Sequence, residues 1–231
     1  MMEENTKNMK RPRINELLTE EAERVGRITE EFERGFEFLR NYEKAATIFG
    51  SARSESKEEY YQKARKLAQL LAKDGFAVIT GGGPGIMEAA NLGAVEAGGR
   101  SVGINIELDG QHPTERRNKH VKEGESFHYF FSRKVMLAFA SEVYFYLPGG
   151  FGTLDEFFEI LTLVQTGKMS PVPIILVHRD FWEPFLDFID KTLRDKYATV
   201  NSENTSLYHL VDTPQEAFDL AKELMKEYGL E

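Results

Sequence analysis

Short, nearly continuous apolar segments alternate with segments of helical spacing along this chain, and the alternation leaves few folds open. The apolar segments lie at 45–50, 76–80, 100–104, 142–147, 173–177 and 207–211. Strands that are apolar along their whole length are typical of a parallel sheet covered on both faces by helices. The sequence therefore predicts an α/β fold, a Rossmann-like doubly wound parallel sheet with helices on both faces.

Three of these segments end in glycine-rich turns, at 50–53, 81–88 and 147–153. Right-handed crossovers and the usual doubly wound strand order place the first strand beside the strand of 142–147, so the turns should converge at the carboxyl edge of the sheet. We expect Gly149, Gly150 and Gly152 to take positive φ and to direct main-chain N–H groups at an anion above the following helix. Pro84 is expected at the first position of its helix. The turns predict a phosphate-binding crevice.

Two charged positions near these turns each have two interpretations. Glu156 can face the bound compound as a reactive carboxylate, or Thr153 and Glu156 can form a capping box at a helix start. If Ser132 caps a helix, Arg133 and Lys134 lie at its positive end, and such an unfavourable placement is typical of a functional site. The alternative is two solvated charges on a surface turn.

An N-terminal helical extension is expected over residues 13–40, after a disordered tail at 1–12 and before a nucleotide-binding catalytic domain at 41–231. Apolar side chains recur every seven residues along it, at Leu18, Val25, Phe32 and Leu39. This amphipathic helix packs either on the domain or on a second subunit, and Gly35 weakens its last turn by about 1 kcal/mol relative to Ala. The polar segment 105–125 is expected to be an irregular loop over the site.

Composition and the absence of certain motifs restrict the function. The chain has no cysteine, and its five histidines lack paired metal-ligand spacing, so we expect neither a metal nor a cofactor. A net charge of -9 disfavours nucleic-acid binding. No segment approaches the roughly 18 apolar residues of a membrane span, and no apolar signal segment is present, so a cytoplasmic protein is expected.

Common nucleotide and hydrolase fingerprints are missing as well. Ile86 stands where a dinucleotide fingerprint has its third glycine, and that turn follows the second strand instead of the first. Neither a P-loop nor a GxSxG elbow occurs. A pocket for a small phosphorylated ligand is left, with Arg133 and Glu156 as candidate reactive groups.

Three motifs in order carry a family resemblance: GGGPGIMEAAN at 81–91, the RK pair at 133–134 and PGGFGTLDE at 148–156. Over about residues 44 to 195 the chain resembles the Lonely Guy (LOG) family of nucleoside 5′-monophosphate phosphoribohydrolases. The resemblance implies a Rossmann-like fold, a homodimer or larger homo-oligomer, and hydrolysis of an N-glycosidic bond to free base and ribose 5-phosphate. Phe130-Phe131 replaces the Met-His of plant members, which favours the longer bacterial branch. Some relatives are labelled lysine decarboxylases, but no residue here indicates a pyridoxal Schiff base.

Residue by residue, the resemblance implies that Glu156 and Arg133 are catalytic and that the glycine loops hold the phosphate of an AMP-like substrate. The substrate-binding residues expected on this basis are Gly50, Ser51, Arg53, Gly82, Gly83, Gly85, Met87, Glu88, Lys134, Gly149, Gly150, Phe151, Gly152 and Thr153. The alternative function is a non-catalytic nucleotide-binding or molybdenum-cofactor carrier protein of the same fold. A scaffold that acts through the N-terminal helix would leave the three glycine turns unused.

Overall fold

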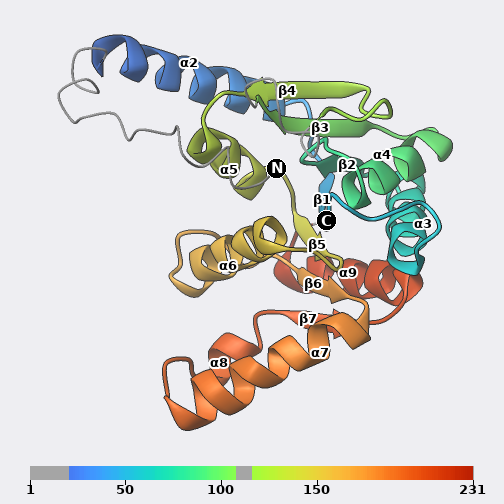
Figure 1. Cartoon of the computed structure of the whole chain (residues 1–231), viewed down its shortest axis with the longest axis vertical. Helices are drawn as coiled ribbons and strands as arrows, with labels where there is room; N and C mark the ends of the chain where they lie inside the picture. Colours follow the sequence, from blue (N-terminus) through green and yellow to red (C-terminus); the bar gives the residue numbers. More distant parts are fainter. Residues whose placement is uncertain (1–20, 108–115, 231) are drawn as a thin grey trace, which may run out of the picture.

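The computed structural model describes residues 21–107 and 116–230, which form a seven-stranded parallel sheet between two layers of helices (Figure 1). The strand order is β4-β3-β2-β1-β5-β6-β7, and every neighbouring pair is parallel. The strands are β1 Ala45–Phe49, β2 Ala77–Thr80, β3 Ser101–Ile106, β4 Glu123–Phe127, β5 Val143–Tyr146, β6 Ile174–Val177 and β7 His209–Val211. The predicted Rossmann-like sheet is confirmed.

Each face of the sheet has its own core, because successive side chains of a strand point to opposite faces. Ala46 and Ile48 of β1 join the core beneath α3 (Glu59–Lys73), α4 (Ile86–Glu96) and α9 (Pro214–Tyr228). Ala45 and Phe49 join the other core. That second core is covered by α2 (Glu21–Leu39), α5 (Phe130–Ala138), α6 (Phe151–Gln165) and α7 (Arg179–Phe188). A π-helix, Ile189–Lys196, continues α7, and the short α8, Ser202–Thr205, precedes β7.

The N-terminal helix α2 packs on the domain through its C-terminal half. Phe32 and Leu39 contact the second core, whereas Val25 is 56% exposed. A Cβ at Gly35 would lie 2.5 Å from the Met136 sulfur, so this glycine lets α2 approach α5 closely, beyond its effect on helix propensity. The tail 1–12 and Leu18 lie outside the described residues.

The prediction of an irregular loop over 105–125 is wrong at both ends. Strand β3 continues to Ile106, and β4 begins at Glu123. Strand β4 lies at the edge of the sheet and four of its five residues are partly exposed, which explains its polar sequence. Residues 108–115 of the predicted loop lie outside the described part of the chain.

The strand order places the switch point at β1, which has β2 on one side and β5 on the other. Phe49 pairs with Tyr146 at the carboxyl ends of β1 and β5. The main-chain N–H of Ser51 donates to the carbonyl of Pro148 at 2.9 Å, which joins the two following turns. The expected convergence of these turns at one edge is therefore observed.

Candidate active site

A cavity of about 820 Å³ opens at this carboxyl edge, between the turns after β1 and β5 and helix α5. Many of the residues expected to bind substrate line it, together with both candidate catalytic residues. These are Gly50, Ser51, Arg53, Met87, Arg133, Gly149, Gly150, Phe151, Gly152, Thr153 and Glu156. The main contributors that the sequence did not indicate are aromatic or imidazole side chains, namely Phe49, Tyr60, Phe130, His178 and Phe181.

The turn before α6 presents open backbone to the cavity. Helix α6 begins at Phe151, and its N-cap residue, Gly150, provides no side-chain cap. A Cβ on Gly150 or Gly152 would meet no atom within 4 Å, whereas a Cβ on Gly149 would lie 2.1 Å from the Thr153 hydroxyl oxygen. A ligand can therefore approach the first main-chain N–H groups of α6, at the positive end of the helix dipole.

The expectation of positive φ at Gly149, Gly150 and Gly152 is wrong, because none of the three adopts it. Positive φ occurs instead at Gly82, with φ 72°, and at Gly85, with φ 69°. In the turn before α6, glycine is needed for space at Gly149, and the other two leave the backbone accessible. The left-handed backbone conformation therefore occurs in the turn that follows β2 and not in the turn before α6.

The turn that follows β2 packs against the turn that follows β1, which lines the cavity. A Cβ on Gly85 would lie 2.2 Å from the carbonyl oxygen of Ser51, and Asn118 donates its side-chain N–H to the carbonyl of Gly83 at 2.8 Å. Gly82, Gly83 and Gly85 do not line the cavity, and neither does Glu88, which lies 3.8 Å from the His120 ring. Pro84 precedes the start of α4 by two residues, so its expected place at the first helical position is wrong.

Arg133 is a buried cation in the cavity wall. Helix α5 already begins at Phe130 with Tyr129 as its N-cap, so the condition that Ser132 caps the helix is not met. The guanidinium Nε donates to the carbonyl of Ile104 at 2.9 Å, and Nη2 donates to the carbonyl of Gly81 at 3.3 Å. With 8% of Arg133 exposed, the alternative of a solvated surface charge is also wrong.

Glu156 lies one turn into α6 and is 8% exposed. Its Oε2 atom has no hydrogen-bond partner among the described residues, and the capping box with Thr153 is not formed. Burial raises the pKa of Glu156 from 4.5 to about 7, and the charges of Lys134 and Arg133 oppose that rise. A carboxyl group of this kind exchanges a proton near neutral pH, as a general acid or base must.

Lys134, the neighbour of Arg133, does not line the cavity. Its ammonium group lies 2.5 Å from a carboxylate oxygen of Asp155 and 3.2 Å from one of Glu159. Burial alone lowers the pKa of Lys134, but the hydrogen bond to Asp155 and the charge of Glu156 raise it overall. Lys134 therefore ties α5 to α6 as a cation and acts on Glu156 through its charge.

Neither a membrane-spanning helix nor a cluster of metal ligands occurs among the residues that the structure describes. None of their helices is long and apolar enough to cross a membrane. Across 21–107 and 116–230, no three His, Cys, Asp or Glu side chains converge on a position for a metal ion.

Solved structures similar to this one include the molybdenum cofactor carrier protein of Chlamydomonas reinhardtii, with a TM-score of 0.57 and 22% identity over 79% of this chain and 98% of that chain. The molybdenum cofactor binding protein of Rippkaea orientalis also has a TM-score of 0.57 and 22% identity, over 78% of this chain and 95% of that chain. At this identity the likeness shows the fold alone.

Curated relatives have closer sequences. A cytokinin riboside 5′-monophosphate phosphoribohydrolase of Rhodococcoides fascians is 27% identical over 68% of this chain and 79% of its own length. The enzyme of that name from Oryza sativa subsp. japonica called LOG is 33% identical over 64% of this chain and 60% of its own length. A probable enzyme of the same kind from that plant is 30% identical over 76% of this chain and 71% of its own length.

The family model described as "possible lysine decarboxylase" matches residues 87–221, more than half of the chain. This segment includes the RK pair of α5 and the whole of the PGGFGTLDE turn. The family-model match and the curated relatives agree with the motifs that line the cavity. The chain therefore belongs to the Lonely Guy (LOG) family.

Proposed function

We propose that this protein hydrolyses the N-glycosidic bond of a nucleoside 5′-monophosphate of the AMP type and releases the free base and ribose 5-phosphate. The observation that carries the proposal is the buried carboxyl of Glu156, with one unpartnered oxygen and a pKa of about 7. It lines the same cavity as the buried cation Arg133. The curated relatives, named as phosphoribohydrolases, support the same reaction class.

The phosphate of the substrate is assigned to the turn before α6. The residues that follow Gly150 begin the helix without a side-chain cap and line the cavity, and the first N–H groups of a helix suit an anion. Arg53 is exposed at the rim of the same cavity, and within the described residues its guanidinium has no ion-pair partner. The hydroxyl of Ser51 lies in the same turn as Arg53 and accepts its main-chain N–H at 3.1 Å.

Bond cleavage places positive charge on the sugar and negative charge on the departing base. Water adds to C1′ of the ribose, the C1′–N bond breaks with its electron pair going to the base, and the base takes up a proton. A carboxylate at the sugar stabilises the oxocarbenium-like transition state or accepts the proton of the attacking water, as in glycosidases. This role is assigned to Glu156. Arg133, whose guanidinium is held by two carbonyl groups, supplies a fixed positive charge for the base or clamps the substrate.

The test is incubation of the protein with a panel of nucleoside 5′-monophosphates and the matching nucleosides, followed by chromatography of the free bases. We expect AMP or a related monophosphate to be cleaved. Its nucleoside should be a much poorer substrate, because a nucleoside has no phosphate to bind at the turn before α6. Equal cleavage of AMP and adenosine would contradict the phosphate assignment. Tight binding of a monophosphate without release of base would favour the non-catalytic carrier function.

A further inference from the structure

His178 forms a wall of the cavity and has an unusual backbone conformation. It follows β6 and precedes α7, with φ 90° and ψ 90°. Residues other than glycine rarely adopt such angles, and strain of this kind gathers at functional sites. Among the described residues Ala198 is the other non-glycine with positive φ, and Ala198 does not line the cavity.

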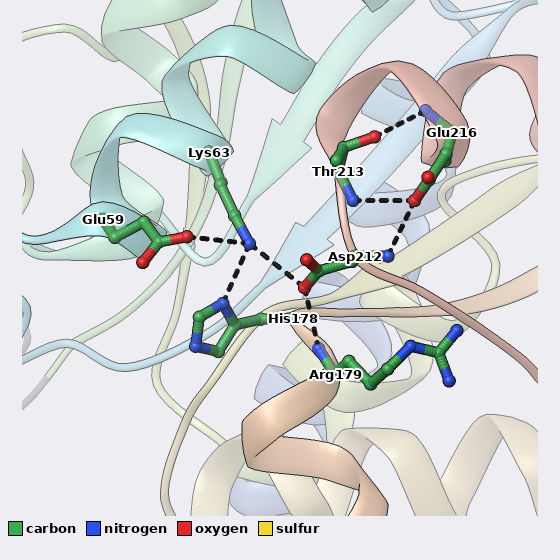
Figure 2. A network of polar contacts seen from close by, with 7 residues as sticks. All are labelled: Glu59, Lys63, His178, Arg179, Asp212, Thr213 and Glu216. Atoms are coloured by element: carbon green, nitrogen blue, oxygen red, sulfur yellow. Dashed lines mark hydrogen bonds and ion pairs between the residues drawn. The ribbon is translucent and has the colours of Figure 1, made fainter.

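A cation on α3 fixes the ring of His178 (Figure 2). The Lys63 ammonium nitrogen lies 3.1 Å from Nδ1 of His178, 3.0 Å from a carboxylate oxygen of Glu59 and 3.2 Å from one of Asp212. Burial alone lowers the pKa of Lys63, but the hydrogen bonds to Glu59 and Asp212 raise it overall, so the group is an ammonium ion. An ammonium ion only donates hydrogen bonds, so Nδ1 accepts and Nε2 carries the ring hydrogen.

The sheet register places His178 beside the phosphate turn. Tyr146 of β5 pairs with Leu176 of β6, and Pro148 and His178 each lie two residues beyond this pair, in the segments that follow the two adjacent strands. Pro148 in turn accepts the hydrogen bond from Ser51 on the other side. Adjacent strands lie about 4.8 Å apart, so the three strand ends make one continuous wall. Arg133 lies toward the opposite end, where Ile104 of β3 and the turn after β2 anchor it.

We propose that His178 is a substrate-binding residue that donates its Nε2 hydrogen to the 5′-phosphate, and that Lys63 is the positioning residue that fixes this tautomer. This inference rests on the proposed function. His178 lines the cavity, so its Nε2 hydrogen is the donor assigned to the phosphate, and the ammonium ion on Nδ1 adds a favourable charge for that anion. The strained backbone is retained because it brings the ring between Lys63 and the cavity.

The experiment uses His178→Gly, which removes the ring and relieves the positive φ. We expect an unchanged or higher melting temperature, a KM for AMP about tenfold higher with kcat within about threefold, and an unchanged kcat/KM for adenosine. The dissociation constant of ribose 5-phosphate, measured by calorimetry, should also rise about tenfold. His178→Asn tolerates positive φ and keeps an N–H donor, so its affinity should fall by less. Ala198→Gly is the matched control and should leave ribose 5-phosphate binding unchanged.

A second measurement concerns the tautomer. Imidazole ¹⁵N NMR should show the hydrogen of His178 on Nε2, and Lys63→Met should mix the tautomers and weaken ribose 5-phosphate binding several-fold. If the wild type cleaves AMP and His178→Gly binds ribose 5-phosphate equally well, the role of His178 is refuted and the proposed function stands. If no monophosphate is cleaved but His178→Gly still weakens ribose 5-phosphate binding, the proposed function is refuted and the role of His178 stands. A wild type that neither cleaves a monophosphate nor binds ribose 5-phosphate would overturn both.

Discussion

At the scale of single residues, the buried carboxyl group of Glu156 lowers the stability of the folded protein when it is ionised. Its pKa is about 7 in the folded state and 4.5 when solvated, because burial removes water from the charged form. The folded protein therefore binds this proton more tightly than the unfolded chain. Stability contributed by this group falls as the pH rises from 4.5 to 7, and the loss is complete above the folded pKa.

The first prediction is that Glu156→Gln separates stability from turnover. The amide does not ionise, so the variant should be more stable than the wild type at pH 8, on the order of 1–3 kcal/mol, and close to it at pH 5. Turnover should fall by roughly 100-fold or more. Thermal unfolding at both pH values and release of base from AMP measure the two effects. Glu183→Gln, on the exposed side of α7, is the control and should change neither the stability nor the turnover. A less stable Gln variant at pH 8 would contradict the assigned burial penalty.

The second prediction concerns the pH dependence of the reaction. If Glu156 acts as a carboxylate, kcat/KM should rise with pH along a limb centred within about one unit of 7, because this parameter reports ionisation in the free enzyme. Removing the Lys134 charge raises the pKa of Glu156, so Lys134→Met should move the limb to higher pH. Rates measured between pH 5 and pH 9 test both statements. A limb near 4.5 would mean that the essential carboxyl is solvated.

At the scale of elements, α2 fixes the start of the helix that carries Arg133. Glu31 of α2 is 5% exposed, and its carboxylate accepts the main-chain N–H of His128 at 2.5 Å and that of Tyr129 at 3.4 Å. It also accepts a hydrogen bond from the hydroxyl of Ser132. The first turn of a helix leaves N–H groups unpaired and favours negative charge nearby, so α2 supplies what α5 lacks.

The third prediction is that Glu31→Ala reduces both stability and activity. Loss of the carboxylate leaves the partly buried main-chain N–H groups of His128 and Tyr129 without this acceptor, which costs about 1–3 kcal/mol, and the shift of Arg133 should lower kcat/KM several-fold. Glu33→Ala, at an exposed position of the same helix, should change neither. Thermal unfolding and steady-state kinetics provide the measurements. Unchanged activity in a destabilised Glu31→Ala would restrict α2 to a structural role.

Most elements were predictable because their apolar residues repeat with a clear period, and the failures have particular physical causes. Strand β4 was missed because an edge strand with partly exposed residues has no apolar run. Of the two interpretations of Glu156, the capping box is not formed because Gly150 is the N-cap, which puts Thr153 and Glu156 inside the helix. A glycine cap without a side chain leaves no polar pattern that marks the first residue of the helix.

The candidate site was predictable only where a local motif encodes it. The PGGFGTLDE motif indicates directly both Glu156 and the turn to which the phosphate is assigned under the proposed function. Lys134 shares a motif with Arg133, yet one residue turns a helix by about 100°, so their side chains face different partners. His178 was missed because its contact with Lys63 spans 115 positions and its backbone angle has no sequence signal.

At the scale of the whole molecule, α2 and α5 leave apolar side chains on one surface. Phe36 is 42% exposed and Phe139 is 53% exposed, and their ring centroids lie 6.4 Å apart. Contiguous exposed apolar groups are typical of interaction surfaces. The fourth prediction is therefore a homodimer or larger homo-oligomer, whose mass by light scattering should fall in Phe139→Lys. Phe188→Lys on α7 is the control, since Phe188 is 51% exposed elsewhere. A monomeric wild type would contradict the prediction.

The position of β1 between β2 and β5 has a consequence for the nascent chain. The edge of β1 that faces β5 is completed only by residues such as Tyr146, which is synthesised 97 residues after its partner Phe49. At about 5–20 residues per second, that interval lasts roughly 5–20 s. During it, an apolar strand has a row of unpaired N–H and C=O groups, which is a template for aggregation. Chains that terminate before β5 should therefore aggregate, and ribosome-associated chaperones should engage this protein before the candidate active site is assembled.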